Sequence, residues 1–220
     1  MPPARAHRDD RGRPGVRPQP QRRLRRREHR PRSRRPMTPL VELARGAWPE
    51  SEVDAEPPVL AGFVMSTFSP LVAEAAKRCL TRAHGQPPVA AERGLRTAVI
   101  VSSATGDAAT AAEVATAVDG GRRLGPLLFF QAVPNAVAGY VAARWELGGP
   151  VVSLSPGGGP DPVAESLAEG LAMASLLIRD GDADEALIVV AEQALGDGGR
   201  DRALAVLVRD SEVNRPKECS

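Results

Sequence analysis

One strand-to-helix turn carries the residues whose types could support nucleophilic chemistry. Ser155 ends the apolar segment VVSLS at 151–155, and the chain continues with the turn sequence PGGGP. A serine nucleophile needs a base beside it and often sits in a G-x-S-x-G turn, which this segment lacks. The chain's three histidines all precede the turn, at His7, His29 and His84. We therefore interpret Ser155 as the end of a strand.

The glycines at 157–159 raise a second possibility, which is phosphate binding. A glycine-rich turn that opens a helix presents backbone N–H groups to an anion. The segment has neither the Lys-Ser/Thr pair of a P-loop nor the G-x-G-x-x-G spacing of a dinucleotide site. We favour a tight strand-to-helix turn, keep anion binding as the alternative, and expect no cofactor.

The two cysteines give no sign of a metal centre or a disulfide framework. Cys79 and Cys219 lie far apart in the sequence and have no neighbours at metal-ligand spacing. Cys79 falls on the apolar face of a predicted helix, where a cysteine usually behaves as a small core residue. We expect neither a bound metal nor a reactive thiol.

Charge is divided unevenly along the chain. Residues 1–36 contain 14 arginines, seven prolines and three acidic residues, a net charge of +11, whereas residues 37–220 have a net charge of −9. The first segment has too few apolar side chains to offset the entropy of ordering, so we predict a disordered arm. Its arginines could bind nucleic acid or membrane phosphates. We favour a simpler interpretation, in which the start codon is assigned too far upstream and the functional domain is residues 37–220.

No segment predicts insertion in a membrane. No apolar run approaches the roughly 20 uncharged residues that a spanning helix needs, and no apolar signal core follows the charged start. We expect a cytoplasmic location.

From residue 59 onward, apolar runs alternate with helical patterns. We predict strands at 59–65, 96–103, 151–155, 185–191 and 202–209. Helices are predicted at 70–84, 107–118, from Pro134 to about 147, and at 161–181, with 127–133 extended. Residues 37–58 predict a short helix around 40–47 and a linker, and residues 211–220 a tail. The alternation favours an α/β domain at 59–210, with a mixed five-stranded sheet and flanking helices.

One predicted helix is apolar almost all round. Residues 170–178, GLAMASLLI, have no polar face. A helix of this kind belongs between two layers of structure. We therefore expect the helix to need a second cover besides the sheet.

Three segments occur in an order and at a spacing that point to one family. They are RTAVIVSSATGDAATAAEVATAV at 96–118, GPLLFFQAVPNAVAGYVAARWELGGPVVSLSP at 125–156, and LIRDGDADEALIVVAEQ at 177–193. Together they resemble the N-terminal domain of β-ketoacyl synthases, in the thiolase superfamily. The resemblance implies a thiolase-like half and a place in polyketide or fatty-acid-type biosynthesis, where the family catalyses decarboxylative Claisen condensation.

The chain departs from the family pattern at the nucleophile. In the family a cysteine begins the apolar helix, and counting from Gly149-Pro150 places Gly158 at that position. The family's two catalytic histidines belong to a second half that has no counterpart after this turn. The resemblance therefore implies a protein that does not condense acyl chains alone, so whether it is an enzyme stays open.

The resemblance implies partners as well as a fold. We predict a non-catalytic subunit, similar to a chain-length factor, that acts with a full ketosynthase and an acyl carrier protein or forms a homodimer. The alternative is a degenerate or scaffold protein without acyl chemistry. Family members pair across a two-fold axis, which implies an interface at Asn135, Tyr140, Trp145, Val151, Val152, Ser153 and Leu154.

Overall fold

The computed structural model describes residues 39–211, except 64, 95, 132, 158 and 195–198. The arm predicted at 1–36, and all of the tail predicted at 211–220 except residue 211, lie outside the described residues, and both stay predictions. Within the described part of the chain, no helix is long and apolar enough to cross a membrane.

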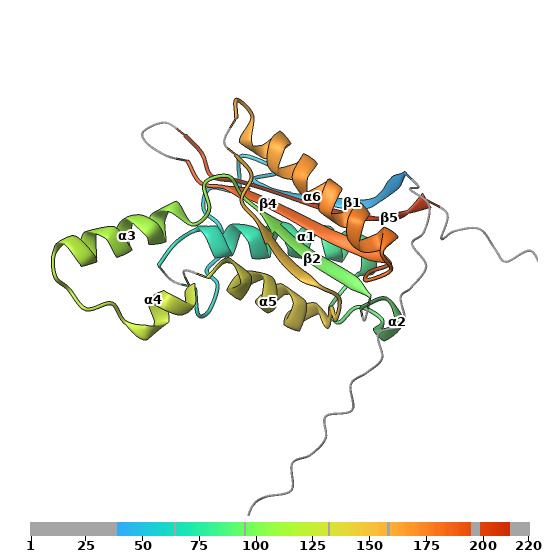
Figure 1. Cartoon of the computed structure of the whole chain (residues 1–220), viewed down its shortest axis with the longest axis horizontal. Coiled ribbons are helices and arrows are strands. Elements are labelled where there is room, and N and C mark those ends of the chain that lie inside the picture. The colour runs from blue at the N-terminus through green and yellow to red at the C-terminus, as the bar shows by residue number, and fades with distance from the viewer. Residues whose placement is uncertain are drawn as a thin grey trace, which may run out of the picture. The chain divides into compact units, whose positions relative to one another are not determined.

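A mixed five-stranded sheet forms the centre of the domain, as predicted (Figure 1). The strands lie in the order β1-β5-β4-β2-β3, with β2 parallel to β3 and β4, and with β5 antiparallel to β4 and β1. Their bounds are β1 Leu40–Trp48, β2 Thr97–Ser102, β3 Val151–Leu154, β4 Glu185–Glu192 and β5 Arg202–Asp210. Strand β3 is one edge of the sheet.

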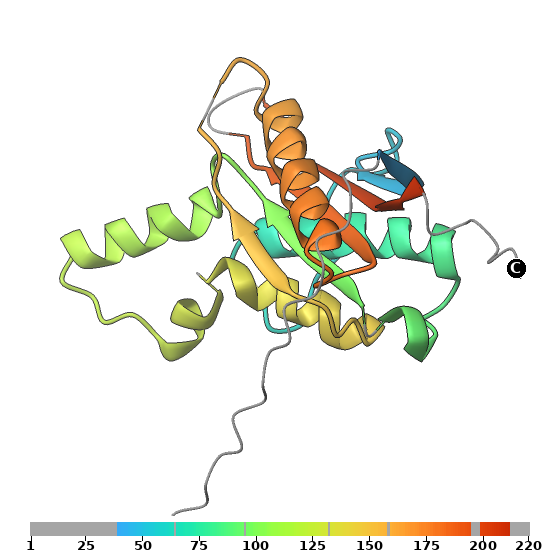
Figure 2. The same cartoon turned by 45° about the vertical axis from the view of Figure 1, so that its right-hand side comes forward.

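Six helices accompany the sheet in the described part of the chain. They are α1 Phe68–His84, α2 Ala91–Gly94, α3 Ala108–Asp119, α4 Pro126–Gln131, α5 Pro134–Trp145 and α6 Pro162–Arg179. Helices α1 and α5 cover one face, and α6 lies across the other (Figure 2). Helices α3 and α4 project beyond the sheet (Figure 1).

The alternation of side chains along β4 creates two cores. Leu187 and Val189 pack into the core under α1 and α5, whereas Ile188 and Val190 pack under α6. Every residue of β4 is buried, because the strand lies between two others and under helices on both faces. The continuous apolar run in the sequence reflects this double burial.

Helix α6 lies close to the sheet at Gly170. A row of small or short side chains faces β4, and a Cβ placed on Gly170 would lie 2.5 Å from Cγ2 of Ile188. Ser166, Ala174 and Ile178 are buried on the same face of the helix. Leu176, on the opposite face, is 42% exposed, and no second helix of the described residues covers it.

Three predicted elements were wrong. Residues 40–47, predicted as helical, belong to strand β1, because pairing with β5 outweighs the local helical preference. The described residues of 59–65 form no strand, since Gly62 has a φ of +86° and turns the chain between Leu60 and Phe63. The segment predicted as extended begins with helix α4, because a short apolar run does not distinguish a strand from a helix.

Candidate functional site

The carboxyl ends of β2, β3 and β4 meet at one edge of the sheet, where ligands bind in open α/β folds. Three segments converge there: the loop after β2, the turn at 155–161 after β3, and the end of β4. Gly158, which the sequence places at the family's cysteine position, lies outside the described residues. Ser155 is exposed in the same turn.

Two carboxylates of the chain itself supply negative charge at the start of α6. Asp161 caps the helix by accepting a hydrogen bond from the backbone N–H of Ala164, with 3.1 Å between the nitrogen and Oδ1. The carboxyl group of Glu165 folds back against Gly159, so that a side chain there would collide with it. Both acids lie where the helix dipole favours negative charge. This arrangement disfavours phosphate binding by the glycine turn.

Glu192, at the end of β4, holds the loop after β2 in place. Its Oε1 accepts hydrogen bonds from the backbone N–H of Ala104 at 2.7 Å and from the hydroxyl of Ser166 at 2.9 Å. Its Oε2 accepts bonds from the hydroxyl of Thr105 at 2.8 Å, the backbone N–H of Thr105 at 3.1 Å and the hydroxyl of Ser103 at 3.3 Å. One buried carboxylate therefore joins three segments of the site.

Sequence reasoning missed Glu192. The available signal was an acidic residue directly after the apolar run ALIVVA, because a buried carboxylate must be hydrogen-bonded. The donors, however, come from residues 103–105 and from α6, and the sequence alone does not show that they meet.

In the described part of the chain, no histidine or cysteine side chain lies at the carboxyl ends of β2, β3 and β4. His84 ends α1 and interacts electrostatically with Glu185, which begins β4, so it lies at the opposite end of the sheet. Cys79 is fully buried in the core between α1 and the sheet, and burial raises the pKa of its thiol to about 12. No cluster of potential metal ligands occurs among the described residues.

The predicted interface residues divide into two groups. Asn135 and Ser153 lie together at the edge strand β3, where the Ser153 hydroxyl donates to Oδ1 of Asn135 at 2.5 Å. Val151 is exposed beside them, and Val152 and Leu154 pack partly under α6.

Trp145 and Tyr140 face elsewhere. Trp145 is 3% exposed and belongs to the core, so it offers no interface surface. The ring of Tyr140 packs edge-on against Phe63, at 6.1 Å between centroids, and points from α5 toward α1.

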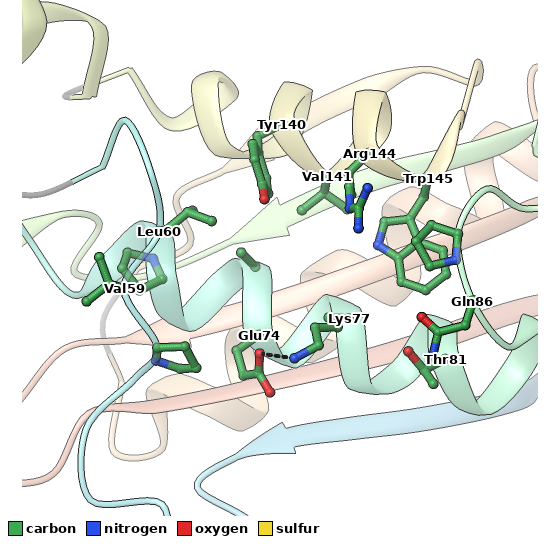
Figure 3. A pocket seen from close by; sticks show the side chains of 14 residues that line it. Val59, Leu60, Glu74, Lys77, Thr81, Gln86, Tyr140, Val141, Arg144 and Trp145 are labelled. Atoms are coloured by element: carbon green, nitrogen blue, oxygen red, sulfur yellow. Dashed lines mark hydrogen bonds and ion pairs between the residues drawn. The ribbon is translucent and has the colours of Figure 1, made fainter.

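A cavity of about 320 Å³ lies between α1 and α5, on the side of the sheet away from α6. Figure 3 shows Tyr140, Val141, Arg144 and Trp145 directed from α5 toward Lys77 and other residues of α1. The loop at 58–60 forms a further wall. Sequence reasoning did not anticipate this cavity.

Comparison with known proteins assigns the family. Residues 58–198 match the model for the β-ketoacyl synthase N-terminal domain. The chain belongs to this family. The predicted resemblance and the thiolase-like fold are thus confirmed. A search of curated proteins by sequence found no match.

Several solved structures share the fold. The ketosynthase ApeO in complex with its chain length factor ApeC, from Xenorhabdus doucetiae, is 18% identical, with a TM-score of 0.58 and coverage of 80% of each chain. A β-ketoacyl synthase from Burkholderia phymatum STM815 is 15% identical, with a TM-score of 0.59 and coverage of 80% of this chain and 60% of that one. The ishigamide ketosynthase/chain length factor is 21% identical, with a TM-score of 0.56 and coverage of 76% and 50%. The chain spans only half to three-fifths of the last two relatives.

Proposed function

We propose that this protein is a ketosynthase-like subunit of polyketide or fatty-acid-type biosynthesis that carries no acyl nucleophile of its own. It acts beside a complete β-ketoacyl synthase and an acyl carrier protein, in the manner of a chain-length factor. Family membership supports the biosynthetic setting, and similarity in fold to a ketosynthase in complex with its chain length factor supports the partnership.

The observation that carries the proposal is the composition of the α6 start. A condensing enzyme needs a thiolate there, which the helix dipole stabilises. In this chain the sequence count places Gly158 at that position, and Asp161 and Glu165 already supply negative charge at the start of α6. A thiolate at the turn would face like charge, which raises the pKa of a thiol.

The exposed edge of β3 supports a partner. An edge strand presents unpaired backbone N–H and C=O groups that a strand of another chain can complete. Val151 adds an exposed apolar side chain, 38% exposed, at the same edge. A partner strand paired there would extend the sheet across the interface.

Two measurements test the proposal. Incubation with acyl-carrier thioesters should leave the intact mass of the protein unchanged, and Gly158→Cys should not produce condensation. A stable acyl adduct on the unaltered chain would contradict the non-catalytic role.

The second measurement is binding to a ketosynthase from the same host, by sedimentation velocity. Val151→Lys should weaken the complex, whereas Val53→Lys should not, because Val53 is 90% exposed on a distant loop. Equal binding of both variants, or no complex with the unaltered chain, would favour a scaffold without acyl chemistry.

A further inference from the structure

The cavity between α1 and α5 has the size and lining of a small-molecule site. Its volume of about 320 Å³ is near the lower end for ligand pockets. Trp145, Val141, Leu60 and Pro70 give it apolar walls. Its polar lining residues are Glu74, Lys77, Thr81, Gln86, Tyr140 and Arg144. A compact ligand with an apolar body would fit these walls.

The charges around the cavity are unbalanced. The only acidic residue that lines it in the described part of the chain, Glu74, is already paired with Nζ of Lys77 and Nε of Arg78, each at 3.0 Å. Arg78 in turn forms two hydrogen bonds with Asp54, at 2.8 Å each. The carboxylate of Glu74 is therefore neutralised by neighbours on its own helix.

Arg144 has no such partner. It lines the cavity from α5, and no hydrogen bond or ion pair joins it to any described residue. Its guanidinium lies between Val141 and Trp145 in Figure 3, on the same side of the helix as Tyr140. A guanidinium presents parallel N–H donors that match the two oxygens of a carboxylate.

We propose that this cavity binds a small carboxylic acid with an apolar body, independently of the function proposed above. The carboxylate pairs with Arg144, and the apolar part packs against Trp145, Val141 and Leu60. Tyr140, four residues before Arg144, lines the same cavity. A nucleotide is a poorer fit, because its phosphates would call for several unpaired cations and Lys77 is already bound to Glu74.

Calorimetric titration of the full chain with phenylacetate and with phenylacetamide tests the proposal. The two probes share a shape and differ in charge, so phenylacetate should bind about tenfold or more tightly than the amide. Arg144→Gln should remove this preference, while Arg123→Gln, an exposed arginine outside the cavity, should keep it. Tryptophan emission should change on binding, since Trp145 lines the site.

A second variant tests the location. Ala73→Leu fills the cavity from α1 and should abolish binding while an unchanged circular dichroism spectrum confirms the fold. Equal affinity for the two probes, retention of the preference in Arg144→Gln, or no binding of phenylacetate at millimolar concentration would each overturn the proposal.

Discussion

At the scale of single residues, the structure is held by polar groups whose partners lie far away in the sequence. Glu192 collects donors from the loop after β2 and from α6. Gln193 continues the pattern, since its amide nitrogen donates to the hydroxyls of Ser66 and Thr67, at 3.1 and 2.8 Å. Together the two side chains fix the carboxyl edge of the sheet.

We expect Glu192→Gln to lower the free energy of unfolding by about 2 kcal/mol, because an amide NH₂ would replace one acceptor oxygen and face donors. Urea denaturation measures the change. Glu169→Gln is the matched control, since Glu169 is exposed on α6 and should change stability by less than about 0.5 kcal/mol. A loss no larger than that of the control would show that the hydrogen bonds of Glu192 add nothing to stability.

His84 makes stability depend on pH. Burial lowers the pKa of its imidazole, Arg93 lowers it further, and Glu185 acts in the opposite direction. The unfolded chain then takes up a proton near pH 6.5 while the folded protein still resists protonation, so acidification favours unfolding. We expect thermal stability to fall from about pH 7 to 5. The contribution of His84 to this fall should vanish in His84→Gln.

The control for the histidine prediction is His29→Gln, which should leave the pH profile unchanged. Identical profiles for the unaltered protein and for His84→Gln would refute the assignment. The Nε2 atom of His84 is buried without a hydrogen-bond partner among the described residues, which is consistent with a neutral imidazole.

At the scale of helices and strands, close backbone approach decides which glycines are essential. Gly170 brings α6 against Ile188 of β4. Gly46 of β1 lies against the backbone N–H of Cys79 in α1, with no room for a Cβ. Gly139 of α5, by contrast, has open space where a Cβ would lie.

Gly170→Ala and Gly139→Ala should therefore have opposite effects. The change at Gly170 pushes α6 away from the sheet and should cost about 1–3 kcal/mol. The same change at Gly139 should stabilise the protein by up to about 1 kcal/mol, because alanine has the higher helix propensity. Denaturation midpoints compare the two. Stabilisation by both changes would mean that α6 shifts freely.

The sequence predicted elements well where burial alone determines the pattern. Strands β2, β4 and β5 were identified because their apolar runs reflect burial in the sheet. Strand β1 was missed because its pattern is interrupted by charged residues and it owes its conformation to pairing with β5. The glycine turn was found from composition, whereas Glu192 and the Arg144 cavity required knowledge of which helices meet.

At the scale of the whole domain, the two faces of the sheet are covered unequally. Two helices, α1 and α5, cover one core, and among the described helices only α6 covers the other. Val152, Leu154, Leu171 and Leu177 remain partly exposed around α6. The second cover predicted for this helix therefore stays a prediction, and a partner protein or a second copy of the chain would supply it.

We expect the purified chain to associate at micromolar concentration. Leu176→Lys should shift it toward the monomer, because Leu176 is 42% exposed on the outer side of α6 and burying it favours association by roughly 1.5–3 kcal/mol. Sedimentation equilibrium measures the shift, and Val53→Lys serves as the control for added charge. A monomer that binds no hydrophobic dye would contradict the expectation.

The pairing of β1 with β5 also governs when the sheet can be completed. Leu40 pairs with Asp210 and Trp48 with Ala203, so the first strand of the sheet pairs with the last. During synthesis β1 leaves the ribosome early and has no partner strand until almost the whole domain has followed. Non-local pairing of this kind slows folding and leaves an unpaired strand open to wrong partners in the interval. The rate of translation thus sets how long the nascent chain must remain protected from aggregation.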